Sequence, residues 1–328
     1  MREIWNFTFL SSIVFIAAFG VTYVVMPWLI KALTRAKILA RDLHKKGTPA
    51  IPTMGGIGIF VGVAAALTLS GILNLDYRYS FAIFLSGTLA VLAGLIDDLF
   101  TLNKISLVVL TFLVSLPVIA FRAGSTLVYL TPFGPKDLGW FFWFVVPFDF
   151  AFLMNGVNIY AGFNGIEAGL GIVTSISLGV SALFYGSWES AISLFALSGA
   201  LLAFLRWNWF PSKIFIGNSG TLLIGAVLAS SIIAGTIKVV GAIALLPYFI
   251  NFILRARDRF SSTVADVEAL PDGTLKNNRI TALWALFTYK SSAKETSLVI
   301  RCILIQAVFG LCAVIFANYH ANLITLSP

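Results

Sequence analysis

Long apolar runs separated by short polar segments make up most of the chain. Ten runs stand out, at residues 8–30, 53–73, 80–97, 105–121, 140–156, 165–186, 188–205, 219–234, 237–254 and 296–316. Apolar runs of about 17–25 residues can cross a bilayer as helices, whereas the strands of a membrane barrel alternate polar and apolar residues. These runs are continuously apolar, with Gly, Ala and Ser scattered inside them, as packed membrane helices prefer. We therefore expect an all-α polytopic membrane protein of ten transmembrane helices.

Composition strengthens this expectation. Hydrophobic residues make up 59% of the 328-residue chain, charged residues only 11%, and the mean hydropathy is +0.95. Soluble globular domains carry about 25% charged residues, so composition excludes that class. We expect a single integral membrane domain over residues 1–328, with a long, polar and turn-rich loop at about 255–294 as a candidate substrate lid.

The positions of Lys and Arg predict which side of the membrane each loop faces, because short cytoplasmic loops carry an excess of basic residues. Sixteen of the 22 Lys and Arg residues follow odd-numbered runs, five lie on the opposite side, and Arg301 lies in the last run. The odd loops are therefore expected in the cytoplasm, and both termini outside or in the lumen. The net charge of +8 is then explained by topology and anionic ligands rather than by nucleic-acid binding.

Four polar motifs follow odd-numbered runs, so all four are expected on the cytoplasmic face. They are the Asp97–Asp98 pair, the stretch NGVNIYAGFNGIEAGLG at 155–171, FIGNSG at 215–220, and the 255–294 segment. This convergence predicts an active site built from cytoplasmic loops.

Adjacent aspartates beside hydrocarbon are costly to keep ionised unless a cation or hydrogen-bond donors meet them. The pair at 97–98 therefore indicates metal or phosphate chemistry, or a helix end solvated by water. Like charges in contact also raise the pKa of one carboxyl. A raised pKa would suit a general base working near neutral pH.

The asparagine-rich stretch carries four polar side chains: Asn155, Asn158, Asn164 and Glu167. Residues three apart share a helix face, while Gly162 and Gly165 allow the chain to break and bend before the second pair. Amide oxygens can coordinate magnesium or hydrogen-bond a nucleotide. The alternative is that each asparagine caps or joins membrane helices.

Basic residues in three loops are candidates for phosphate binding. Alternating arginines hold paired phosphates well through their fork-shaped donors, and lysines beside a membrane attract anionic lipid. The alternative for all of them is ordinary anchoring at the cytoplasmic surface. The candidates are Arg255, Arg257, Arg259, Lys45, Lys46 and Lys104.

Taken in order, these motifs resemble the polyprenyl-phosphate N-acetylhexosamine-1-phosphate transferases of glycosyltransferase family 4. The resemblance covers most of the chain, from the Lys and Pro-rich loop at 41–56 to the basic last loop. It implies a membrane enzyme that moves a sugar 1-phosphate from a UDP-sugar to a polyprenyl phosphate with Mg²⁺, or alternatively Mn²⁺. A homodimer is a further expectation.

The particular residues of these motifs resemble one branch of that family. Bacterial members usually read DG.DG where this chain has AGFNG, and NGVNIYAGFNGIEAG looks like the archaeal and eukaryotic branch. That branch transfers GlcNAc-1-phosphate from UDP-GlcNAc to dolichyl phosphate, the first step of lipid-linked oligosaccharide synthesis for N-glycosylation. The membrane would be an archaeal plasma membrane or the endoplasmic reticulum.

The resemblance also implies roles for the candidate residues. Asp97, Asp98 and Lys104 would be catalytic, and Asn158 and Asn218 would hold the metal. Substrate binding would fall to Lys45, Lys46, Asn155, Asn164, Glu167, Arg255, Arg257 and Arg259.

One residue departs from the family pattern, and it leaves alternatives open. The loop at 215–220 usually reads Phe-x-Gly-Asp in the family, and here Asn218 stands at the aspartate. An amide is a weaker ligand for a hard dication than a carboxylate. The alternatives to the transferase are a membrane transporter or a catalytically silent homologue that binds a nucleotide sugar.

Overall fold

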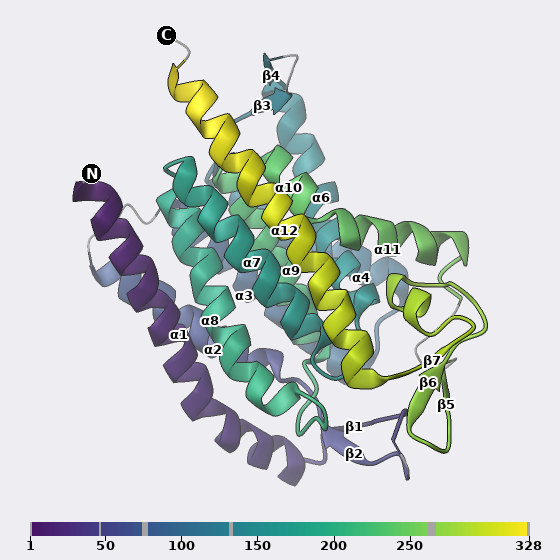
Figure 1. The fold of residues 1–328 in the computed structure, drawn as a ribbon. Coiled ribbons are helices and arrows are strands. Elements are labelled where there is room, and N and C mark those ends of the chain that lie inside the picture. The colour runs from purple at the N-terminus through teal and green to yellow at the C-terminus, as the bar shows by residue number, and fades with distance from the viewer. Residues whose placement is uncertain (1, 46, 74–77, 131–133, 262–266, 327–328) are drawn as a thin grey trace.

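The computed structural model describes residues 2–45, 47–73, 78–130, 134–261 and 267–326, and most of them are helical (Figure 1). All ten apolar runs coincide with helices. Eight of them match single helices: α1 (Arg2–Arg35), α2 (Gly56–Ile72), α3 (Arg78–Phe100), α6 (Gly139–Tyr160), α7 (Ile166–Phe184), α8 (Trp188–Asn208), α9 (Gly217–Ala234) and α12 (Glu295–Leu326). The remaining two match pairs of helices, α4 (Lys104–Val114) with α5 (Leu116–Ala120) and α10 (Lys238–Ala244) with α11 (Leu246–Arg257).

The expectation of a mostly helical membrane protein is confirmed, while the count of ten spans stays a prediction. Among the described residues, seven helices are long and apolar enough to cross a membrane, or eight if α10 and α11 form one bent span. Two shorter apolar helices, 56–72 and 104–120, cover the other two expected runs.

Helix α9 lies at the centre of the bundle, where it packs against α3, α6 and α2 (Figure 1). In the most apolar stretch of α9, 89% of the residues are buried, compared with 28% in that of α1. Small residues on the neighbouring helices allow this close packing. A Cβ at Gly94 of α3 would lie 2.4 Å from the Cα of Ser219, so only glycine permits α3 to approach the start of α9.

The 255–294 segment, which is expected on the cytoplasmic side, follows a broken helix. Helices α10 and α11 meet at an angle of 61°, and Pro247 stands in the first turn of α11. Proline lacks the amide hydrogen that would continue the preceding helix. The bend directs α11 away from the other helices, toward the right of Figure 1.

Three small antiparallel sheets are additions to the expected all-α fold. They pair β1 (Leu39–Arg41) with β2 (Ala50–Pro52), β3 (Leu127–Leu130) with β4 (Gly134–Asp137), and β6 (Thr274–Lys276) with both β5 (Glu268–Ala269) and β7 (Ser292–Lys294). Strands of two to four residues are too short to show alternation, so periodicity could not predict them.

The described residues of the 255–294 segment contain regular structure as well as turns. Besides β5, β6 and β7 it contains the 3₁₀ helix η2 (Leu283–Phe287). The Pro-Asp-Gly sequence at 271–273 forms a turn, since Gly273 has φ +81° and its amide donates to the Leu270 carbonyl at 2.9 Å. The β1–β2 and β5–β7 sheets lie toward the lower end of the view, whereas β3–β4 lies near the C-terminus at the top (Figure 1).

The close approach of α3 to α9 yields a stability prediction. Gly94→Ala should lower the free energy of unfolding by about 1–3 kcal/mol, because an added methyl group at a closely packed site forces the backbones apart. Thermal unfolding of the purified protein in detergent measures the effect. Gly71→Ala in α2 is the matched control, since a Cβ there meets nothing within 4 Å. Equal melting temperatures for the two variants would contradict the packing described here.

Candidate functional site

A cavity of about 370 Å³ lies where three segments far apart in sequence meet. Most of its lining comes from residues 40–44 around the end of β1, from the end of α6 and the turn after it, and from residues 215–221 leading into α9. Thr53, Asp98 of α3 and Asn208 of α8 complete the lining. Five of the residues predicted from the sequence line it together: Asp98, Asn158, Asn164, Glu167 and Asn218.

Backbone pairing fixes two of these walls against each other. The Phe215 amide donates to the Pro52 carbonyl at 2.8 Å, and the Gly55 amide donates back to the Phe215 carbonyl at 2.9 Å. The chain after β2 therefore runs beside the segment that enters α9. This pairing holds the first loop close to the start of α9 although more than 150 residues separate them in the sequence.

Asp98 caps the N-terminus of α9. Its Oδ1 accepts the Asn218 amide hydrogen at 2.8 Å, and its Oδ2 accepts that of Ser219 at 3.1 Å. The first amides of a helix have no partner inside the helix, and the helix dipole favours negative charge at that end. The two amides therefore offset part of the desolvation cost of an ionised carboxylate at the cavity wall.

Asp97 points in a different direction from Asp98, as neighbours on a helix must. Its Oδ1 accepts the Leu102 amide hydrogen at 2.8 Å, and its Oδ2 accepts the Asn218 side-chain amide at 2.8 Å. Asp98 lines the cavity, and Asp97 is not among its lining residues. The adjacent pair is thus divided between a carboxylate at the wall and one that holds Asn218.

The turn after α6 forms the second wall, and its predicted break is confirmed. Gly162 and Gly165 have φ of +135° and +88°, values that favour glycine. Glu167, buried at the start of α7, accepts the Gly162 amide hydrogen at 3.0 Å through Oε1. Asn158 accepts the Thr221 hydroxyl at 3.3 Å, which links α6 to α9.

Several predicted residues lie outside the cavity lining. Asn155 donates to the Ala151 carbonyl at 2.8 Å and to the Thr111 hydroxyl at 3.4 Å, so it joins α6 to α4. Lys104 is exposed at the start of α4. Lys45 is paired with acidic residues, and Lys46 lies outside the described residues.

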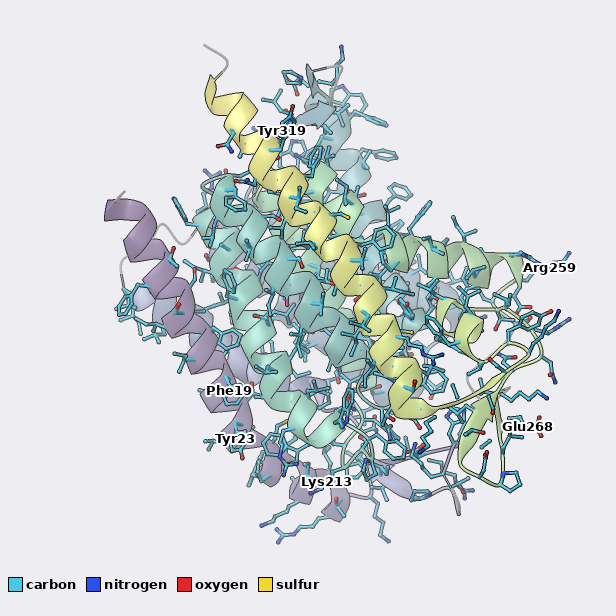
Figure 2. All side chains as sticks on the ribbon, viewed as in Figure 1. Phe19, Tyr23, Lys213, Arg259, Glu268 and Tyr319 are labelled. Carbon is cyan, nitrogen blue, oxygen red and sulfur yellow. The ribbon has the colours of Figure 1, made fainter. Side chains whose placement is uncertain are left out.

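The three arginines of the last loop also lie outside the lining of the cavity. Arg255 is buried and donates to the Ile159 carbonyl at 3.4 Å, where it satisfies a carbonyl at the end of α6. Arg257 and Arg259 are exposed. Figure 2 shows Arg259 at the far end of α11, away from the helical bundle.

Sequence reasoning missed two acidic residues at the site. Asp42 lines the cavity, and Glu295 at the start of α12 accepts the Asn164 amide hydrogen at 2.8 Å. Both are 5% exposed. Asp42 stands among basic residues and Glu295 directly follows Lys294, so both read as ordinary surface charges in the sequence. Only their burial distinguishes them.

The oxygen atoms at the cavity suit magnesium. Within the described part of the chain, no group of three or more His, Cys, Asp or Glu side chains could hold a metal ion. The available ligands are mixed instead, with the Asp98 carboxylate beside the amides of Asn158 and Asn218. Magnesium takes oxygen ligands, needs only one or two carboxylates and keeps several waters. These three residues fit that requirement.

The fold and the cavity together define a polytopic helical membrane protein with a polar site. Residues 80–236 match the profile of the family described as "Glycosyl transferase family 4". Two archaeal proteins, each named "Putative UDP-N-acetylglucosamine--dolichyl-phosphate N-acetylglucosaminephosphotransferase", are similar to the chain. The one from Saccharolobus solfataricus is 32% identical over 249 residues, which is 74% of this chain and 77% of that protein. The one from Sulfolobus acidocaldarius is 31% identical over 256 residues, 75% and 77% of the two chains.

A bacterial relative extends the comparison. The "Phospho-N-acetylmuramoyl-pentapeptide-transferase" of Desulforamulus reducens is 33% identical over 247 residues, 67% of this chain and 73% of that protein. The chain belongs to glycosyl transferase family 4. It is an enzyme that transfers a sugar 1-phosphate to a polyprenyl phosphate, within a family that is generally magnesium-dependent.

The different placement of the two aspartates yields a prediction about turnover. Asp98→Asn should lower kcat about 10²-fold or more, because preorganised charge at a reacting centre commonly contributes that much. Asp97→Asn should lower kcat less, because Asp97 acts through Asn218. Release of nucleoside monophosphate at saturating nucleotide sugar measures both. A larger loss in Asp97→Asn than in Asp98→Asn would contradict the assignment.

Proposed function

We propose that the enzyme transfers GlcNAc-1-phosphate from UDP-GlcNAc to dolichyl phosphate, which gives GlcNAc-pyrophosphoryl-dolichol and UMP. The observation that carries this proposal is the gathering of Asp98, Asn158, Asn164, Glu167 and Asn218 around one cavity. The names of the two archaeal relatives support the choice of GlcNAc and of dolichyl phosphate. The sequence NGVNIYAGFNGIEAG, which includes the turn of the second wall, supports the same choice.

The proposed chemistry is phosphoryl transfer, in which positioning and charge neutralisation supply most of the catalysis. An oxygen of the lipid phosphate forms a bond to the β-phosphorus of UDP-GlcNAc. The bond from that phosphorus to the bridging oxygen breaks, and UMP leaves with the electron pair. A lipid phosphate is already largely ionised near neutral pH, its second pKa being about 6. A strong general base is therefore not required.

Each side chain then has a proposed part in this step. Asp98, held in place by the first α9 amides, would supply negative charge for the magnesium ion, while Asp97 keeps Asn218 in place. Magnesium held by Asp98, Asn158 and Asn218 would withdraw charge from the two phosphates. Asn164 and Glu167 shape the donor pocket.

A two-step route through a phosphosugar on an aspartate is the competing mechanism. In Asp97 and in Asp98, each of the two carboxylate oxygens already accepts a hydrogen bond. An oxygen that accepts hydrogen bonds is a weaker nucleophile, because its charge is already partly neutralised. We therefore favour direct attack by the lipid phosphate.

The remaining assignments complete the proposal. Lys104, with Lys46, binds the lipid phosphate, while Arg257 and Arg259 reach the donor from a substrate loop at about 255–294. Residues 1–328 form one domain with ten spans, its site at the cytoplasmic face and its termini outside. The expected membrane is an archaeal plasma membrane. The expected homodimer receives no support from the relatives or from the fold.

The proposal is tested by purifying the protein in detergent and supplying dolichyl phosphate, Mg²⁺ and UDP-GlcNAc. We expect UMP and a GlcNAc-pyrophosphoryl lipid in equal amounts, without any ion gradient. A parallel reaction with UDP-MurNAc-pentapeptide should release no UMP. Turnover of the muramoyl donor alone would contradict the GlcNAc assignment, and binding without turnover would favour a silent homologue. Movement of substrate across sealed vesicles without UMP release would favour a transporter.

The amide at position 218 yields a prediction about metal dependence. Asn218→Asp replaces a hydrogen bond to Asp97 by two adjacent carboxylates, which repel each other in the absence of a cation. We expect this variant to melt at a lower temperature than the parent chain in EDTA. We also expect a larger rise in melting temperature when Mg²⁺ is added, because a ligand that binds the native state stabilises it. An equal rise in both proteins would show that residue 218 does not face the metal.

A further inference from the structure

Four polar side chains behind and within the cavity wall form a closed ring, which we call the clasp: Asp42, Lys45, Asn164 and Glu295. The Lys45 ammonium lies 3.4 Å from Asp42 Oδ2 and forms a second ion pair with Glu295. Asn164 completes the ring, because its backbone amide donates to Glu295 Oε1 at 2.8 Å and its side-chain amide donates to Asp42 Oδ2 at 3.2 Å.

The clasp joins three segments that are remote in sequence. Asp42 and Lys45 follow β1, Asn164 belongs to the turn after α6, and Glu295 begins α12. Aromatic contacts reinforce the same junction, since the His44 ring stacks on Phe163 at 5.2 Å. The Lys45 ammonium also lies 4.4 Å from the centre of the Phe210 ring.

The four members divide into two pairs by position. Asp42 and Asn164 line the cavity, whereas Lys45 and Glu295 do not. Asp42, Asn164 and Glu295 are each 5% exposed, so the charges of the clasp are largely removed from water. Burying an ion pair costs desolvation energy that the attraction often fails to recover. Net stability alone therefore explains the clasp poorly.

The hydrogen bonds of the clasp also decide how Asn164 is oriented. An ionised carboxylate can only accept hydrogen bonds, so the amide nitrogen of Asn164 must face Asp42. The position and direction of the Asn164 side-chain oxygen are set in turn. Glu295 fixes the backbone of the same residue from the opposite side of the ring. The backbone of Asn164 is thus held by the Glu295 carboxylate, and its side chain by the Asp42 carboxylate.

We propose that Glu295 is a positioning residue for the nucleotide-sugar donor, acting through Asn164 and Lys45 on the wall of the cavity. This inference rests on the proposed function, which assigns the cavity to the donor. Lys45 belongs to the same unit, as the cation that holds the two carboxylates together. It is a support for the wall rather than a ligand of the lipid phosphate.

Removing Glu295 leaves the Asn164 amide and the Lys45 ammonium without this acceptor. The wall then loses its fixed position before the donor arrives, and binding must supply the ordering. The predicted effect is a weaker affinity for the donor, with little change in kcat at saturating donor because Asp98 and the start of α9 are untouched. A loss of folding would instead lower the melting temperature and the amount of active enzyme.

The test measures the Kd of UDP-GlcNAc by isothermal titration calorimetry with the full chain in detergent and Mg²⁺. Glu295→Ala should raise the Kd at least tenfold, and Glu295→Gln about threefold, because glutamine still offers Oε1 to the Asn164 amide. Lys45→Met should raise it as well. The Lys45→Met/Glu295→Gln double variant should show less than the product of the single effects, as expected for residues in one network.

The matched control is Glu189→Gln. Glu189 also stands in the first turn of a membrane helix, α8, and also accepts a backbone amide, that of Tyr79 at 3.2 Å. Glu189 lies outside the lining of the cavity, so the Glu189→Gln variant should bind UDP-GlcNAc with the same Kd as the parent chain.

Two results would overturn the inference, and they are distinguishable. Unchanged Kd in Glu295→Ala and Glu295→Gln, with a parent chain that binds UDP-GlcNAc, contradicts the role of Glu295 and leaves the proposed function intact. A parent chain that binds no UDP-GlcNAc contradicts both. If Glu295→Ala fails to fold, Glu295→Gln decides alone: a Kd equal to that of Glu189→Gln rejects the proposal.

Discussion

The bond between the Asp98 carboxylate and the first amides of α9 is the interaction on which the rest of the site depends. It joins α3 to the central helix of the bundle at a point where unpaired amides would be costly in a low-dielectric environment. Because α9 also packs against α6, its position sets that of Asn158. A change at this contact would therefore be felt at two walls of the cavity.

The site is assembled from loops, yet helices hold each loop in place. Pairing of residues 52–56 with 215–216 ties the first loop to α9, and the clasp ties it to α12 and to the turn after α6. Charges and backbone bonds thus replace the apolar packing that holds the rest of the bundle together. Such an arrangement suits an enzyme whose substrates meet at the boundary between water and lipid.

The sequence predicts the helices well and the site in part. Ten apolar runs all fall on helices, because hydrophobic length is a strong signal in a membrane protein. The turn at Gly162 and Gly165 was predictable as well, since only glycine readily adopts those φ values. Of the four motifs expected on one membrane side, three contribute residues to the cavity lining, among them Asp98, Asn158 and Asn218, whereas the 255–294 segment contributes none.

The sequence could not predict which way a side chain points or whether it is buried. Adjacent aspartates look equivalent in a sequence, yet helix geometry turns Asp98 toward the cavity and Asp97 toward Leu102 and Asn218. Arg255 reads as an exposed phosphate ligand in the sequence, and only the structure shows that it is buried and donates to the Ile159 carbonyl. Glu295 has no motif around it, since its role depends on residues more than 130 positions away.

The central claim is that the cavity between β1, the end of α6 and the start of α9 holds the sugar-phosphate donor. An electron cryo-microscopy structure of the protein with UDP-GlcNAc and Mg²⁺ tests it most directly. The account predicts the two phosphates of the donor beside Asp98, Asn158 and Asn218, with Asn164 and Asp42 against another part of the molecule. Density for the donor outside this cavity, with the cavity filled only by water, would contradict it.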